Sequence, residues 1–143
     1  MRILVILLSV FFLFRCSSDD ANNSSDDEVY LEIARNRIID GDWIATFFLD
    51  NSQNRTLEFE EYSFNFHNDK SIEITYDLNN YVGSWNVFVV DEKLKFHMMI
   101  DVPDINILYE LNENWEVQYI LEDRIVIKKS ELVDSKILHF SKN

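Results

Sequence analysis

From Gly41 to the end of the chain, apolar and polar residues alternate with a period of two in short runs. This alternation is typical of β-strands with one buried face and one face in water. Polar pairs rich in Asn and Asp separate the runs, and these residues tolerate the left-handed backbone of tight turns. We therefore predict eight short strands, at Trp43–Leu49, Leu57–Phe66, Ile72–Tyr76, Trp85–Val89, Leu94–Ile100, Ile105–Tyr109, Trp115–Tyr119 and Ile125–Ile127.

The second of these runs changes its parity partway along. Leu57 and Phe59 share one parity, whereas Phe64 and Phe66 share the other. One extra residue in a strand resets which side chains point inward, so we predict a β-bulge at Glu60-Glu61. The last apolar run, residues 137–140, indicates either a final short strand or a strap across the sheet.

Regular short spacing without helical patterns between the strands indicates an antiparallel meander. The fold class predicted is all-β, an antiparallel up-and-down barrel of eight strands, and a two-sheet sandwich is the alternative. A closed barrel has no free strand edges, which suits a protein exposed to other molecules at a cell surface.

A different pattern precedes the strands. Within Val29–Ile39, apolar residues recur at spacings of three and four, as Tyr30, Ile33 and Ala34 show. We predict a short amphipathic helix there, docked on the barrel. Residues 16–28 are acidic and contain no large apolar side chain, which predicts a solvated tether. Their carboxylates lack the fixed offsets and central glycine of a calcium-binding EF-hand loop.

The N-terminus is predicted to be a targeting signal. The apolar run Ile3–Phe14 follows Arg2 and would span about 18 Å as a helix, which is shorter than the hydrocarbon core of a membrane. Cys16 closes this run, and an acidic stretch follows. The arrangement resembles the lipobox of bacterial lipoproteins, although Arg15 departs from the small residue usual before the cysteine. The resemblance implies removal of residues 1–15 and lipid attachment at Cys16.

Several short motifs resemble those of lipocalin-like domains in bacterial lipoproteins. Gly41-Asp42-Trp43 opens the first predicted strand, Gly83-Ser84-Trp85 opens a later one, and Trp115-Glu116-Val117 follows. The resemblance spans about residues 41–129 and implies a lipocalin-like barrel in which tryptophans close one end. The residues expected to plug the barrel or to line a pocket are Trp43, Phe47, Phe64, Phe66, Trp85, Phe96, Met98 and Trp115.

The composition of the chain argues against several classes of function. The 143 residues carry 13 basic and 26 acidic side chains and a net charge of −13, which argues against binding to nucleic acid. With one cysteine and two glycines, the chain has no cysteine metal cluster, phosphate-binding loop or nucleophile elbow. His67, His97 and His139 lie far apart and lack metal-ligand spacing. We therefore predict no catalytic residue, no metal and no cofactor. A hydrolase using a pair of facing carboxylates is an alternative that the sequence alone leaves open.

Together, these patterns predict three segments: a signal peptide at 1–15, an acidic tether at 16–28 and a barrel domain at 29–143. The expected protein is a non-enzymatic lipoprotein of the cell envelope, held on the outer membrane by lipid on Cys16 and possessing a site for a small apolar ligand. The alternative is a structural or interaction lipoprotein whose barrel is filled and which docks a protein partner. An open or a filled interior separates the two interpretations.

Overall fold

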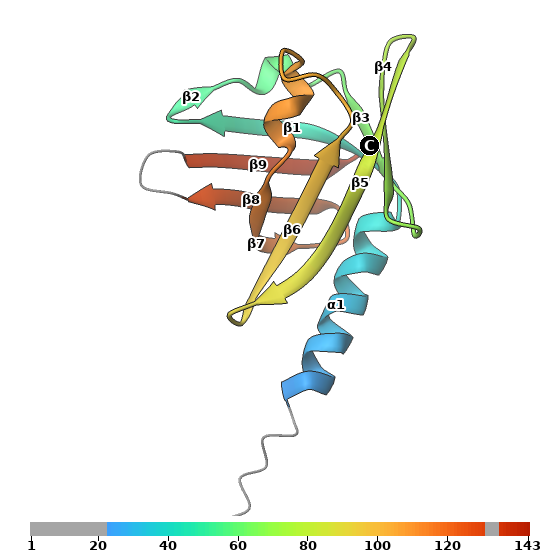
Figure 1. Ribbon diagram of the computed structural model, residues 1–143, viewed down its shortest axis with the longest axis vertical. Coiled ribbons are helices and arrows are strands. Elements are labelled where there is room, and N and C mark those ends of the chain that lie inside the picture. The colour runs from blue at the N-terminus through green and yellow to red at the C-terminus, as the bar shows by residue number, and fades with distance from the viewer. Residues whose placement is uncertain (1–22, 131–134) are drawn as a thin grey trace, which may run out of the picture.

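The computed structural model describes residues 23–130 and 135–143, and most of them form one antiparallel sheet (Figure 1). Strand β9 pairs with β1 as well as β8, so β1 and β3–β9 close into an eight-stranded barrel. The predicted up-and-down, lipocalin-like all-β barrel is therefore confirmed. The strands are β1 (Asp42–Asp50), β2 (Gln53–Asn54), β3 (Ser63–Phe66), β4 (Ser71–Tyr76), β5 (Asn79–Val90), β6 (Lys93–Ile100), β7 (Asn114–Ile120), β8 (Arg124–Ser130) and β9 (Ser135–Lys142).

One α-helix, α1 (Asn23–Ile39), lies beside one end of the barrel, and its first turns extend beyond the strands (Figure 1). It begins before the predicted start at Val29 and includes part of the expected tether. Ala34 and Ile38 are buried against the barrel, whereas Ile33 is 44 % exposed. No helix in the described part of the chain is long and apolar enough to cross a membrane. The signal peptide and Cys16 lie outside the described residues.

The run Ile105–Tyr109 is not a strand, so this prediction is wrong. The chain there forms a 3-10 helix, η2 (Ile107–Leu111), and the Asn106 side chain accepts a hydrogen bond from the Leu108 amide at 2.9 Å. Leu108 and Leu111 are buried, whereas Ile105 is 91 % exposed. A spacing of three places the two leucines on one side of a 3-10 helix, and this spacing overrides the alternation.

The expected strand Leu57–Phe66 is confirmed only in its second half, as β3, whereas its first half and the bulge at Glu60-Glu61 are wrong. Residues Thr56–Glu58 form a second 3-10 helix, η1, which leaves Leu57 exposed and buries Phe59. The sheet instead shifts register in β1, between Ala45 and Phe47, and in β7, between Val117 and Tyr119.

The C-terminal run is a full strand rather than a strap. β9 pairs with β8 on one side and β1 on the other, which closes the barrel. The use of Asn and Asp in turns is confirmed at Asn51, Asp77 and Asp91, all of which have positive φ angles. These residues take the left-handed backbone that glycine more often supplies.

Candidate functional site

Seven of the eight residues expected inside the barrel are buried in one core. Phe66 stands at its centre, with ring centroids 5.5 Å from Trp85, 5.6 Å from Phe96 and 6.1 Å from Phe140, each pair edge-to-face. Edge-to-face contacts at these separations are the favoured packing of aromatic rings. The barrel interior is therefore filled with side chains in this region. The seven buried residues are Trp43, Phe64, Phe66, Trp85, Phe96, Met98 and Trp115.

Phe47, the eighth predicted residue, does not belong to this core. Its ring packs against the ring of His139 at 4.8 Å, and the next residue, Phe48, is fully buried. The register shift in β1 after Ala45 explains the difference, because one extra residue reverses which side chains face inward. Sequence alternation alone gave no signal of this bulge.

Each of the three tryptophans also donates its indole N–H to a backbone carbonyl. Trp43 bonds to the Ile38 carbonyl at the end of α1, at 2.8 Å. Trp115 bonds to the Leu111 carbonyl at the end of η2, at 3.2 Å. Trp85 bonds similarly to the turn between β3 and β4. Helix ends leave carbonyls without intrahelical partners, so these bonds satisfy them and fasten the connecting segments to the barrel.

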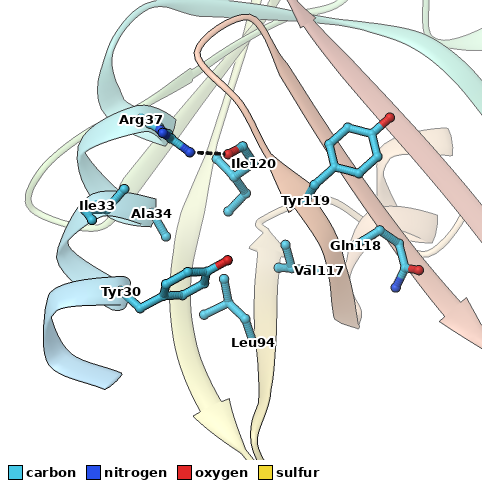
Figure 2. A pocket seen from close by; sticks show the side chains of 9 residues that line it. All are labelled: Tyr30, Ile33, Ala34, Arg37, Leu94, Val117, Gln118, Tyr119 and Ile120. Atoms are coloured by element: carbon cyan, nitrogen blue, oxygen red, sulfur yellow. Dashed lines mark hydrogen bonds between the residues drawn. The ribbon is translucent and has the colours of Figure 1, made fainter. Parts of the chain in front are cut away.

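The barrel does leave a hollow outside, between α1 and strands β6 and β7. This hollow, called the helix groove here, has a volume of about 80 Å³ and an apolar floor that includes Leu94 and Val117. Figure 2 shows Tyr30 above Leu94 and the Arg37 guanidinium at the rim, donating to the Ile120 carbonyl at 2.7 Å. An apolar cavity that binds benzene is about 150 Å³. The helix groove is therefore too small to enclose a drug-sized ligand.

Two ion-pair networks stand out on the surface. Arg55 contacts Asp50, Glu58 and Glu110 at 3.0, 2.8 and 2.7 Å, which joins the β1–β2 hairpin and η1 to η2. These contacts raise the pKa of Arg55, with the hydrogen bond to Glu58 the largest cause, and Arg55 in turn lowers the pKa of Glu58. Arg55 and Glu58 are therefore both charged at neutral pH, and the network holds the β1–β2 hairpin and η1 against η2.

The second network surrounds Glu116 on the outer face of β6–β8. The amines of Lys93, Lys95 and Lys128 lie 3.2, 3.5 and 3.8 Å from its carboxylate oxygens. The hydrogen bond from Lys93 is the largest cause of a lowered pKa for Glu116. Because the carboxylate stays ionised and paired, it is poorly suited to accept a proton from a substrate.

The three histidines stand on separate parts of the molecule. His67 lies 3.7 Å from Glu73, and His97 shares a hydrogen bond of 2.8 Å with the Asn114 side chain. Burial lowers the pKa of His139, and the charge of Arg124 adds to this effect. Within residues 23–130 and 135–143, no three His, Cys, Asp or Glu side chains gather as metal ligands would.

The closed eight-stranded antiparallel sheet defines a lipocalin-like barrel, and a solved structure has a similar fold. The chain is similar to the crystal structure of a DUF4847 family protein from Bacteroides vulgatus, with a TM-score of 0.51 and 12 % identity. The similarity covers 74 % of this chain and 94 % of that one. At this identity it shows a shared fold alone. No protein-family model and no curated protein matches the sequence.

Proposed function

We propose that this chain is a cell-envelope lipoprotein whose barrel is a non-enzymatic interaction module that docks a protein partner on its outer surface. The filled interior carries the proposal. Trp43, Phe64 and Phe96 have no exposed surface, and the rings around Phe66 occupy the space that a lipocalin ligand would need. A small apolar ligand inside the barrel, the other candidate, would require several of these side chains to move.

The helix groove supports the docking role. Tyr30 and Ile33 beside it are 64 % and 44 % exposed, and Tyr119 across from them is 41 % exposed. A space of about 80 Å³ suits one apolar side chain from a partner protein better than a whole ligand. Apolar anchors seated in small pockets and surrounded by polar rims are the usual energetic centre of protein interfaces.

The interior is tested by weighing the full protein, purified from its own membrane, under native and denaturing conditions. Equal masses are expected, apart from bound detergent, because the interior has no room for a ligand. An additional small molecule that is present only in the native spectrum would overturn the filled-barrel proposal. It would support the apolar-ligand module instead.

The docking role is tested with a photo-crosslinking amino acid at Tyr30 in living cells. Leu78 is 95 % exposed and is the matched control, because it belongs to the β4–β5 turn, and Figure 1 shows this turn at the far end of the strands from α1. We expect one discrete crosslinked protein from Tyr30, none from Leu78, and loss of the Tyr30 product when Ile33→Asp places a charge in the groove. The same products from both sites would contradict specific docking.

The lipoprotein assignment rests on Cys16 and the preceding apolar run. A diacylglyceryl group supplies two hydrocarbon chains, and two chains give stable anchoring where one does not. Radiolabelled palmitate should enter the wild-type chain and not Cys16→Ala, and removal of residues 1–15 should accompany labelling. Proteolysis of intact cells would then show whether the barrel faces outward. Unlabelled wild-type protein would refute the anchor and leave the interaction role standing.

A further inference from the structure

A second hollow lies on another side of α1, and its lining includes charged and polar side chains. It has a volume of about 190 Å³, more than twice that of the helix groove. We call it the basic pocket, because two of its side chains are cations that come from different elements. The pocket is lined by Arg35, Ile39, Asn68, Lys70, Trp85 and Asn86.

The two cations lack acidic partners within the described residues. Arg35, on α1, makes one long contact of 3.5 Å with the Val87 carbonyl, and it forms no ion pair with a carboxylate among the described residues. The amine of Lys70 likewise forms no ion pair in the part of the chain that the structure describes. Both side chains are exposed, and no carboxylate of the described residues neutralises either of them. They create a local positive field that suits an anion.

The turn that carries Lys70 is held firmly in place. The amide of Trp85 donates to the Lys70 carbonyl at 2.9 Å, and its indole N–H donates to the His67 carbonyl at 3.1 Å. Lys70 itself has a φ of 70°, which its place in this turn requires. The nearest acid on the turn, Asp69, accepts hydrogen bonds from the Ser71 amide and hydroxyl at 3.0 and 2.6 Å. Lys70 is thus presented on a pinned backbone.

Asn86 adds an independent sign of a missing ligand. Its side-chain oxygen is buried and has no hydrogen-bond partner, and it is the one such side-chain atom among the described residues. A buried acceptor without a donor is costly, and native proteins normally satisfy it. Asn86 lines the basic pocket, but this oxygen has almost no accessible surface, so a ligand hydroxyl or N–H group can supply the donor only when the Asn86 amide turns toward the pocket.

We propose that the basic pocket binds a small hydroxylated phosphate monoester. The phosphate sits between Arg35 and Lys70, and a hydroxyl of the same molecule donates to the Asn86 oxygen once that amide turns toward the pocket. A phosphate monoester carries close to two negative charges at neutral pH, which matches the two cations, whereas a carboxylate carries one. Arginine also presents a fork of N–H groups that fits phosphate oxygens.

Calorimetric titration of the detergent-solubilised full protein with glycerol 3-phosphate tests this proposal. We expect saturable binding that weakens as salt is added, and Arg35→Gln or Lys70→Gln should each weaken it at least about tenfold. Lys93→Gln is the matched control, because it removes the same charge from a lysine that is paired with Glu116 and does not line the pocket. It should change the affinity less than about twofold.

Asn86→Leu separates recognition of the hydroxyl from attraction of any anion. The substitution removes the unpaired oxygen and keeps a side chain of similar volume. It should therefore weaken the binding of glycerol 3-phosphate and leave the binding of inorganic phosphate unchanged. Short-chain phosphatidic acid is titrated in parallel to identify the source of the phosphate. An affinity equal to or higher than that of glycerol 3-phosphate indicates a lipid headgroup, and a lower affinity indicates a soluble ester. Absence of binding, equal binding of sulfate, or full affinity in the Arg35→Gln/Lys70→Gln double variant would overturn the proposal. Because this pocket is separate from the helix groove, none of these outcomes bears on partner docking.

Discussion

The inside of the barrel and its junction with α1 are built in opposite ways. Inside, Phe64, Phe66 and Phe96 have at most 1 % of their surface exposed and pack ring against ring. At the junction, α1 buries Ala34 and Ile38 and leaves hollows on both sides, one apolar and one basic. The apolar side chains inside the barrel bury their surface against one another. The junction leaves surface exposed that another molecule can occupy.

This difference separates stability from recognition. Burial of large aromatic side chains is the main favourable contribution to folding, and a filled interior maximises it. A recognition site needs the reverse, which is incomplete contacts and unpaired polar groups that a second molecule completes. We therefore expect substitutions inside the barrel to change the free energy of unfolding, and substitutions at the junction to change binding with little effect on stability.

Phe66→Ala should have the largest effect. It removes the ring that meets Trp85, Phe96 and Phe140, and it leaves a cavity that these large neighbours cannot fully close. We expect a loss of about 3–5 kcal/mol in the free energy of unfolding, measured with chemical denaturant. Ile33→Ala, at the exposed junction, should cost less than about 0.5 kcal/mol. Equal losses would show that the two regions do not differ as the structure indicates.

Gly83→Ala should have the next largest effect, because β5 and β6 approach closely there. A Cβ atom at Gly83 would lie 2.3 Å from the Met99 carbonyl oxygen and 2.8 Å from the Ile100 Cα, and both are backbone atoms. The strands would have to separate, at a cost of about 3 kcal/mol. Ser84→Ala, one residue along, should be nearly neutral in the same denaturation experiment. A stable Gly83→Ala variant would mean that the barrel wall yields at this position.

The sequence predicted the barrel because its signals were local. Alternation of apolar and polar residues marked the strands, and Asn and Asp at positions such as Asn51 and Asp91 marked the turns. The same signal failed for Ile105–Tyr109, where apolar residues also fit a spacing of three and a capping side chain at Asn106 selects the 3-10 helix.

The candidate sites were less accessible to prediction. The position of Phe47 depends on a bulge that the pairing of β1 with β9 creates, and pairing over such a distance leaves no local trace. The basic pocket joins Arg35 on α1 to Lys70 in a turn and Asn86 on β5. Nothing in the spacing of these residues shows that the fold brings them together, because a site assembled from three elements is defined only after packing.

Trp43→Phe should have a moderate effect and acts where the two regions meet. It keeps an aromatic ring in the core and removes the indole N–H that donates to the Ile38 carbonyl. We expect a loss of about 1–2 kcal/mol, because a buried carbonyl loses its partner. Hydrogen exchange should locate the loss, since the last turn of α1 should exchange faster while the paired amides of β8 change little. Uniform acceleration would indicate that the tryptophan stabilises the whole barrel rather than this attachment.

The smallest expected effect concerns His139, on the outer wall of the barrel. Burial against neighbours that include Phe47 lowers its pKa in the folded protein, and the charge of Arg124 adds to this. As pH falls below about 6.5, the unfolded chain takes up a proton at this residue before the folded chain does. Its contribution to stability is therefore complete above that pH and is lost as pH falls through the folded pKa.

Denaturation of wild type and His139→Gln at about pH 7.5 and about pH 5 should show a wild-type loss of stability that the variant lacks, smaller than the effect of Trp43→Phe. An identical slope in His139→Gln would mean that the ring against Phe47 is solvated enough to accept its proton freely.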